Sequence, residues 1–149
     1  MKTLVIGAAI IDIIMKIKRL PKSGEDILCS ETVSAVGGCA YNVAGTLRGF
    51  GVDHDLFVPV GRGMYGDMIA GDLEKLGYQI LIREEESDNG YCLCLVEEDG
   101  ERTFITVKGA EGRFRPSWFE QLSQDAYDSI YVAGYQVCGT SGGVISDWM

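Results

Sequence analysis

The chain has few positive charges and no apolar run long enough to cross a membrane. Its 149 residues contain 13 Lys and Arg against 22 Asp and Glu, so the formal net charge is −9. A field of that sign repels phosphate backbones and anionic lipid, which argues against nucleic-acid and membrane-surface binding. The longest apolar run is interrupted by Asp12 and is shorter than the roughly 20 residues that a spanning helix needs.

A cysteine framework and a catalytic triad are also missing. The five cysteines are odd in number and contain no C-x-x-C pair, which disfavours disulfide and zinc frameworks and indicates a reduced, cytoplasmic protein. Cys92 and Cys94 lie two apart in a strand-like run and are expected to pack on one face. The only histidine, His54, lies at a strand start, where packing is the simpler role, and no Ser or Cys has a triad partner at a suggestive spacing.

A secretory signal peptide is disfavoured as well, although Lys2 followed by an apolar stretch loosely fits one. β-branched residues predominate in that stretch, as they do in a buried strand. The charged run Lys16–Arg19 follows where a cleavage region is uncharged. We therefore expect the stretch to be a strand of the folded domain.

Apolar runs of strand character alternate with amphipathic helical runs along most of the chain. Strands are predicted at 3–9, 54–60 and 78–82, and helices at 40–50 and 65–77. Strand, helix and strand at this spacing imply parallel pairing with right-handed crossovers. The sequence therefore predicts an open α/β sheet within one domain.

Single residues refine the helix predictions. The first helix is expected to place Val43, Leu47 and Phe50 on one face, with Ala44 and Gly45 allowing close packing. Gly77 is expected to end the second helix in the left-handed conformation. A short helix opened by Pro116, a further strand and the start of a last helix follow.

Four extended runs do not fit the strand-helix-strand series: 12–18, 26–36, 90–97 and 101–108. The last two alternate in polarity and are joined by an Asp-Gly hairpin signal at Asp99. We expect the four runs to form a small separate sheet over one edge of the α/β core. Such a sheet would be a natural lid.

Two adjacent glycines, Gly37 and Gly38, precede the helix that contains Asn42. Ligands of open α/β sheets collect beyond the carboxyl ends of the strands, where glycines let a ligand approach bare backbone amides and a helix start adds partial positive charge. The Asn42 side chain carries one acceptor and two donors, which suits adjacent hydroxyls. A plain capping role for Asn42 is the alternative, and both stay open at this point.

Asp12 interrupts an apolar run at the exit of the first strand, where a carboxylate is costly unless it is paired or solvated. An ionised carboxylate only accepts hydrogen bonds, so it suits two donor hydroxyls of a polyol. The alternative is a turn residue between two strands.

A G-x-G-x-x-G run, Gly61, Gly63 and Gly66, lies between a predicted strand and helix. The acidic run Glu84–Glu86 follows about twenty residues later, as in a dinucleotide-binding fingerprint. The run belongs to the second strand-helix unit rather than the first, and three consecutive acids are also typical of a solvated turn. The dinucleotide interpretation is therefore the weaker one.

These residues resemble the ribokinase-like, PfkB-type family of carbohydrate and nucleoside kinases. The likeness lies in four stretches that follow the family's order over nearly the whole chain: VIGAAIIDI, LPKSGEDI, GGCAYNVAGTLRGFG and VGRGMYGDMIAGDLEKLGY. The resemblance implies a ribokinase-like three-layer α/β/α open sheet with a small β-sheet lid. It also implies transfer of the γ-phosphoryl of ATP, with Mg²⁺, to a hydroxyl of a sugar or nucleoside.

The resemblance implies roles for single residues. Asp12 is similar to the family's acceptor for sugar hydroxyls, and the double glycine with Asn42 to its substrate-binding loop. The implied substrate-binding residues are Asp12, Gly37, Gly38, Cys39, Asn42, Tyr135, Gln136 and Arg102.

The sequence departs from the family pattern at three points. Gly63 stands where the family's Gly-x-Asp-x-x-Gly run has an acid, and Cys39 stands where several sugar kinases have a lysine. The family's second signature, Asp-Thr-x-Gly-Ala-Gly-Asp, supplies the anion hole and the catalytic base, and it is absent. We therefore expect the amino-terminal, substrate-and-lid half of a kinase, incomplete at its carboxyl end, with no catalytic residue or metal ligand and no activity alone.

Two other functions remain as alternatives. The unpaired edges of the expected lid sheet would suit a non-catalytic homodimer that binds polyols. The G-x-G-x-x-G run would suit a dinucleotide-binding oxidoreductase.

Overall fold

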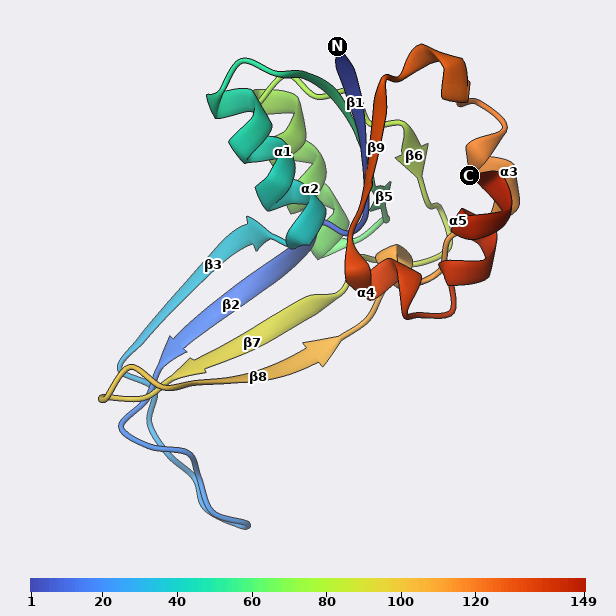
Figure 1. Cartoon of the computed structure of the whole chain (residues 1–149). Coiled ribbons are helices and arrows are strands. Elements are labelled where there is room, and N and C mark those ends of the chain that lie inside the picture. Colours follow the sequence, from blue (N-terminus) through green and yellow to red (C-terminus); the bar gives the residue numbers. More distant parts are fainter.

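The computed structural model describes residues 1–149, and strands alternate with helices as predicted (Figure 1). The strands are β1 (Lys2–Ile6), β2 (Ile10–Lys16), β3 (Glu31–Gly37), β4 (Asp53–Phe57), β5 (Pro59–Val60), β6 (Ile82–Arg83), β7 (Tyr91–Val96), β8 (Arg102–Val107) and β9 (Ser129–Val132). The helices are α1 (Cys39–Gly49), α2 (Met64–Lys75), α3 (Pro116–Phe119), α4 (Gly134–Val137) and α5 (Gly142–Trp148), with 3-10 turns η1 (Ala110–Gly112) and η2 (Gln124–Ala126). None of these helices has the length and apolarity that a bilayer-spanning segment requires.

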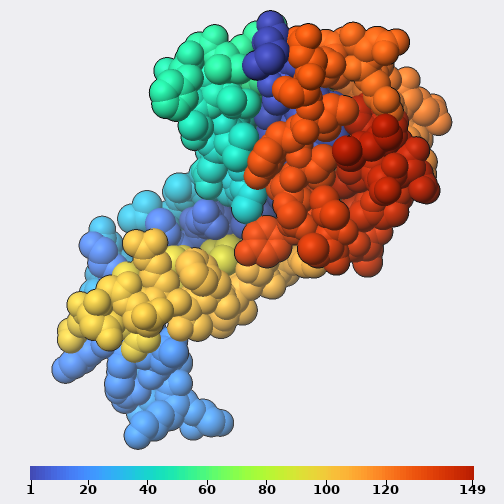
Figure 2. Space-filling view, in the orientation of Figure 1, coloured from blue at the N-terminus to red at the C-terminus, as the bar shows by residue number.

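The strands form three sheets. A parallel sheet in the order β4-β1-β9 and a parallel pair β5-β6 belong to the part of the molecule that we call the body. A sheet in the order β3-β2-β7-β8 forms a second part, which we call the arm. Figure 2 shows the arm standing out from the body. The expected separate sheet therefore exists, built from the four segments that the sequence singled out.

The alternation of side chains in β1 creates the three layers of the body. Val5 packs with residues of α1 and α2, whereas Leu4 and Ile6 pack with Phe114 and with Ile145 of α5. Successive side chains of a strand point to opposite faces, so a strand that is apolar at every position buries both faces. In Figure 1, α1 and α2 lie on one side of β1 and β9, and α3 and α5 lie on the other.

Helix α1 packs closely through Ala44, as predicted, and also through Ala40, whereas Gly45 is exposed. Ala40 and Ala44 are fully buried, Val43 and Leu47 are partly buried against the same core, and Phe50 is 81% exposed. The prediction for Phe50 is wrong because the helix ends at Gly49 and the chain turns away there. Two alanines on the buried face let the helix lie close to the sheet.

Helix α2 ends as predicted, at Gly77 with φ of 81°. The amides of Gly77 and Tyr78 donate to the carbonyls of Glu74 and Leu73, which is the Schellman arrangement. The strand predicted at 78–82 is only partly present, as the two-residue strand β6 that begins at Ile82. Tyr78 belongs to the cap of α2 instead, and β6 has only the two residues of β5 to pair with.

The arm consists of two hairpins joined by parallel pairing of β2 with β7. Its second segment begins at Glu31, not at 26 as predicted, because residues 17–30 form a long connection beyond the end of the sheet (Figure 1), which is mostly exposed after the buried Ile17. The predicted Asp-Gly turn is present between β7 and β8, with Gly100 at φ of 88°. Cys92 and Cys94 are buried on one face, as expected.

The aromatic core beneath α3 generates a stability prediction. Phe57 is fully buried, with its ring centroid 5.0 Å from Phe119 and 6.2 Å from Phe114. We expect Phe57→Ala to lower the free energy of unfolding by about 3–5 kcal/mol in urea titrations, through lost contacts and the cavity left behind. Phe50→Ala is the matched control on the surface and should change it by less than about 0.5 kcal/mol. Equal effects of the two substitutions would refute the layer assignment.

Candidate functional site

The double glycine joins the arm to α1, and neither glycine has room for a side chain. Gly37 pairs with Ile10 of β2, and a Cβ built on it would overlap the carboxylate of Asp12. Gly38 has φ of 103°, and a Cβ there would lie 2.5 Å from the carbonyl oxygen of Ala8. Gly37 therefore makes space for a carboxylate, and Gly38 supplies a backbone conformation that other residues rarely adopt.

Asp12 lies in the middle of β2, so the alternative of a turn residue is wrong. Its neighbours across the sheet are Ala35 and Cys92, and its carboxylate has no cation and no hydrogen-bond donor from the chain. Partial burial raises the pKa of the Asp12 carboxyl. An unpaired, half-buried carboxylate beside a bare backbone is a ready acceptor for donor hydroxyls.

Asn42 lies in the first turn of α1, and its side chain does not cap the helix. The residue at the cap position is Gly38, whose carbonyl accepts the Asn42 amide at 3.0 Å, and no side chain caps this helix. The capping alternative for Asn42 is therefore wrong. Its side-chain amide is exposed and forms no hydrogen bond within the chain. The side chain of Cys39, at the first helical position, is likewise exposed and without a hydrogen bond. Both side chains are free to contact a ligand.

Gln136 lies at the same end of β1 as the double glycine. A Cβ on Gly7 would come within 2.7 Å of Ala40 in α1, 2.9 Å of Ala133 and 3.5 Å of the Gln136 Oε1 atom. Gln136 is only 7% exposed, and its Oε1 atom has no hydrogen-bond partner. Tyr135, the neighbouring prediction, is 79% exposed and points into solvent. The structure thus brings Gln136, but not Tyr135, against the start of α1.

Arg102 is remote from this group. It is the first residue of β8 and lies opposite Val96, which in turn lies opposite Lys16 of β2. Lys16 and Asp12 are four residues apart on one strand, which is about 13 Å at the usual rise. The fold therefore places Arg102 at the outer end of the arm.

The G-x-G-x-x-G run is filled from within the chain. Asp88 accepts hydrogen bonds from the backbone amides of Gly66 at 2.6 Å and Tyr65 at 3.2 Å, at the start of α2. These amides are the donors that a dinucleotide phosphate would need. Glu84 is 4% exposed and pairs with Arg115 at 2.7 Å, so it is neither a ribose ligand nor a solvated turn residue. The dinucleotide interpretation is wrong for this run.

Asn89, which the sequence analysis missed, joins the arm to the body. Its Oδ1 atom accepts the amide of Gly61 at 2.6 Å, and its Nδ2 atom donates to the carbonyls of Ala9 at 3.2 Å and Pro59 at 2.9 Å. The side chain is 3% exposed. All of its bonds reach segments far away in sequence.

Glu111 completes the junction. Its carboxylate accepts the amides of Gly90 and Gly109, each at 2.8 Å, where β7 begins and β8 has ended. Gly90 and Gly109 face each other with no room for a side chain on either. We call Asp88, Asn89 and Glu111 the arm base. The available sequence signal was a set of polar residues flanked by glycines at both ends of the predicted 90–97 and 101–108 hairpin.

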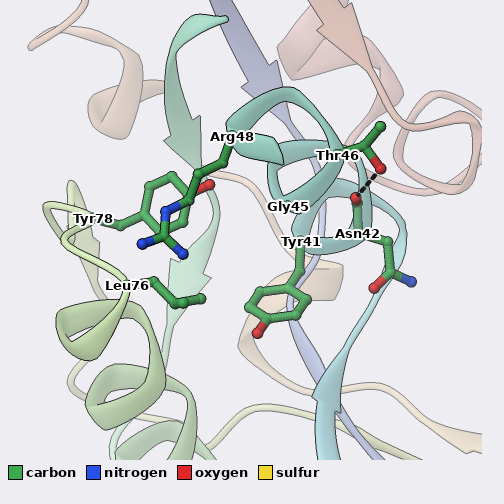
Figure 3. A pocket seen from close by; sticks show the side chains of 7 residues that line it. All are labelled: Tyr41, Asn42, Gly45, Thr46, Arg48, Leu76 and Tyr78. Carbon is green, nitrogen blue, oxygen red and sulfur yellow. Dashed lines mark hydrogen bonds between the residues drawn. The ribbon is translucent and has the colours of Figure 1, made fainter. Parts of the chain in front are cut away.

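A surface pocket of about 350 Å³ lies on the outer side of α1 (Figure 3). Figure 3 shows Arg48, Leu76 and Tyr78 on one side of it and the Asn42 amide pointing away from them. Asn42 is thus shared between this pocket and the start of α1. The lining residues are Tyr41, Asn42, Gly45, Thr46, Arg48, Leu76 and Tyr78.

The tyrosines of this pocket are already bonded. The Tyr41 hydroxyl donates to Asp72 at 2.5 Å, and burial together with this carboxylate raises the pKa of Tyr41 to about 12. The Tyr78 hydroxyl donates to Nε2 of His54 at 2.8 Å, because Nδ1 of that ring donates to a backbone carbonyl. His54 therefore has the packing role that was predicted. Among the side chains that line the pocket, those of Asn42 and Arg48 carry polar groups without a hydrogen bond or ion pair within the chain.

No three His, Cys, Asp or Glu side chains are grouped so as to hold a metal ion. The glycine-rich turn before α2 is filled by Asp88, as described above. The unpaired groups of Asp12 and Asn42 are hydrogen-bond acceptors and donors.

Comparison with known proteins identifies relatives. A model of the family described as "pfkB family carbohydrate kinase" matches residues 1–144. The uncharacterized sugar kinase YegV of Escherichia coli (strain K12) is 38% identical over 146 residues, which are 98% of this chain and 46% of that protein. A ribokinase of Arabidopsis thaliana is 28% identical over 134 residues, 87% of this chain and 35% of that protein. The chain spans less than half the length of these two relatives.

Solved structures show the same fold. A ribokinase from Giardia lamblia has a TM-score of 0.79 at 24% identity, covering 90% of this chain and 42% of its own. Arabidopsis thaliana ribokinase complexed with ribose and ATP has a TM-score of 0.72 at 22% identity, covering 98% and 50%. The predicted ribokinase-like α/β fold is confirmed.

The raised pKa of Asp12 predicts a pH-dependent cost in stability. The folded chain holds this proton more readily than the unfolded chain, so ionisation of Asp12 destabilises the fold as pH rises through the folded-state pKa. We expect Asp12→Asn, which cannot ionise, to be more stable than the wild type at neutral pH. The difference should vanish at acid pH, below the ordinary pKa of an aspartate. Urea midpoints measured across pH test this, and a difference that is constant or grows toward acid pH contradicts it.

Proposed function

The chain belongs to the pfkB family of carbohydrate kinases, and on that premise we propose that it is the substrate-binding part of a kinase that phosphorylates a hydroxyl of a sugar or nucleoside. The observation that carries this proposal is the unpaired, half-buried carboxylate of Asp12 against the bare backbone of Gly37. A carboxylate held without a partner, at a cost in stability, is typical of a binding site.

The proposed contacts follow from donor and acceptor chemistry. Asp12 accepts hydrogen bonds from two hydroxyls of the substrate, and the exposed amide of Asn42 both donates and accepts. Gly37 and Gly38 let the substrate approach the backbone at the start of α1. Cys39 offers a small neutral side chain there, and Gln136 is the contact from α4, which follows β9. We propose no direct contact for Tyr135 or Arg102, since both side chains lie outside this group.

The phosphoryl donor is proposed to bind residues beyond this chain. The sequence has no Asp-Thr-x-Gly-Ala-Gly-Asp run, and the residues present fit neither the nucleotide nor the metal. On this proposal ATP and Mg²⁺ act in the complete enzyme, whose base lies in the part that this chain does not contain, and the 149 residues alone bind substrate without turnover. A cytoplasmic location stays a prediction, which the five free cysteines favour.

The arm is proposed to act as the lid of this site. Asp12 belongs to the arm, whereas Asn42 and Gln136 belong to the body. A substrate that touches all three residues lies between the two parts, so movement of the arm would open or cover it.

Ligand binding by this chain tests the proposal. We expect a panel of sugars and nucleosides to contain compounds that raise its melting temperature, and NADH to have no effect. Asp12→Ala and Asn42→Ala should each weaken binding by about 1–3 kcal/mol, which is roughly 5- to 150-fold in Kd. Asp26→Ala, an exposed acid in the 17–30 connection, is the control and should bind as the wild type does. Failure of every sugar and nucleoside, or unchanged binding in both site variants, refutes the site.

A homodimer through the arm is the second candidate function, and exposed apolar residues at the sheet edges favour it. Val33 on edge strand β3 is 49% exposed, and Phe104 on edge strand β8 is 59% exposed. Edge strands with exposed apolar residues offer pairing surfaces to another chain. Both residues share a face of the sheet with Asp12. Ile14 lies two residues from Asp12 on β2 and therefore on the same face. Val33 and Cys94 lie opposite Ile14, and Phe104 lies opposite Cys94.

Sedimentation velocity over a concentration series tests the dimer. We expect Phe104→Lys to weaken self-association, because a charge on the sheet face opposes its burial against a second chain. Phe50→Lys, on the exposed end of α1, should leave association unchanged. A wild-type chain that is monomeric at every concentration rules the dimer out and leaves the binding proposal intact.

A further inference from the structure

The first turn of α2 is held by Asp88, which lies 22 residues after Gly66 and 23 after Tyr65 in the sequence. The Oδ1 and Oδ2 atoms of Asp88 accept the backbone amides of Gly66 and Tyr65. The cap position of α2 is Gly63, which has no side chain to offer, and no local side chain caps this helix. The carboxylate therefore satisfies amides that would otherwise lack partners, at the positive end of the helix dipole.

The backbone of Asp88 reaches a third segment. Its carbonyl accepts the amide of Ala110 at 2.9 Å, just after the exit from β8. Two residues later, Gly90 leads into β7. Asp88 thus connects the first turn of α2 in the body with the entry and the exit of one hairpin of the arm.

The glycine run makes room for this carboxylate. A Cβ built on Gly63 would collide with the carboxylate of Asp88, and a Cβ on Gly66 would collide with the carbonyl of Gly61. Position 63 itself has no side chain that could cap the helix. Here the space next to the helix start is occupied by an acid that comes from position 88 instead.

We propose that Asp88 is a positioning residue whose carboxylate supplies the helix cap that Gly63 cannot provide and fixes the arm to the amino terminus of α2. A carboxylate at either position satisfies the same helix amides, and the two exclude each other because they need the same space. The proposal rests on the proposed function only in treating the arm as a lid. The experiment below measures folding stability, which does not depend on whether the chain binds a sugar.

Asp88→Ala removes the carboxylate and leaves a space of its size. We expect the unfolding equilibrium constant in urea to rise roughly thirtyfold, or about 2 kcal/mol at 1.4 kcal/mol per factor of ten. Sodium formate should recover part of that loss relative to sodium chloride at equal ionic strength, because the free anion binds the vacated helix start in the folded state alone. A residue that only fills space would not give this anion-specific rescue.

Two variants complete the test. Asp67→Ala is the matched control, since Asp67 is an acid in the first turn of α2 but bonds Arg83 on the surface. It should show a smaller loss and no response to formate. If Asp88→Ala does not fold, Asp88→Asn keeps the shape, and it should still be less stable than the wild type and insensitive to formate.

Exchange of the two acids is tested by a double-mutant cycle. Gly63→Asp should destabilise the wild type more than it destabilises Asp88→Ala, because in the wild type two carboxylates compete for one space. Gly63→Ala reports the backbone strain at φ of 142° together with the clash of its Cβ with Asp88, so the coupling of Gly63→Asp beyond that of Gly63→Ala measures the competition between the two carboxylates. Additive effects of Gly63→Asp and Asp88→Ala, or an equal response of wild type and Asp88→Ala to formate, would overturn the proposal.

Discussion

The structure depends on a buried polar junction, the arm base, between a sheet that stands out from the molecule and the body that carries it. Asn89 alone bonds the backbone of two distant segments, at Ala9 and at Pro59 with Gly61. Glu111 accepts the amide of Gly90, and Asp88 accepts the amide of Gly66. Such groups are costly to bury unless each has a partner, and here each has one or more. A fully bonded network of this kind defines one geometry rather than several. The angle at which the arm leaves the body is therefore set by these hydrogen bonds together with the packing of Ile11 and Tyr91 in the apolar core shared with α2.

The candidate site inherits its geometry from this junction. Asp12 is carried by the arm, while Asn42 and Gln136 are carried by the body. The distances from Asp12 to the other two side chains therefore depend on how rigidly the arm base holds the arm to the body. The body supplies the rest of the rigidity through a sheet that is apolar on both faces.

Much of the fold could be predicted because it follows from local patterns. Three features each depend on a few neighbouring residues: the consecutive apolar residues of β1, the glycine that ends α2 and the Asp-Gly turn of the arm. Phe50 and the segment 26–30 were predicted wrongly. The helical spacing of apolar residues continues to Phe50 although the helix ends at Gly49. Residues 26–30 look extended in sequence but have no neighbouring strand to pair with. Position 12 could be singled out because a carboxylate within an apolar run needs an explanation. The role of Asp88 was not accessible, since its partners lie more than twenty residues away and the glycines around them matched a different motif.

Native-state hydrogen exchange of the backbone amides that donate to the arm base tests the central claim most directly. The amides of Gly61, Gly66 and Gly90 donate to Asn89, Asp88 and Glu111, respectively. If these bonds hold the two parts together, the three amides exchange as slowly as those of β1, through global unfolding. Exchange at the rate of the hairpin turn around Gly100, while β1 stays protected, would show that the arm opens freely and would contradict the account.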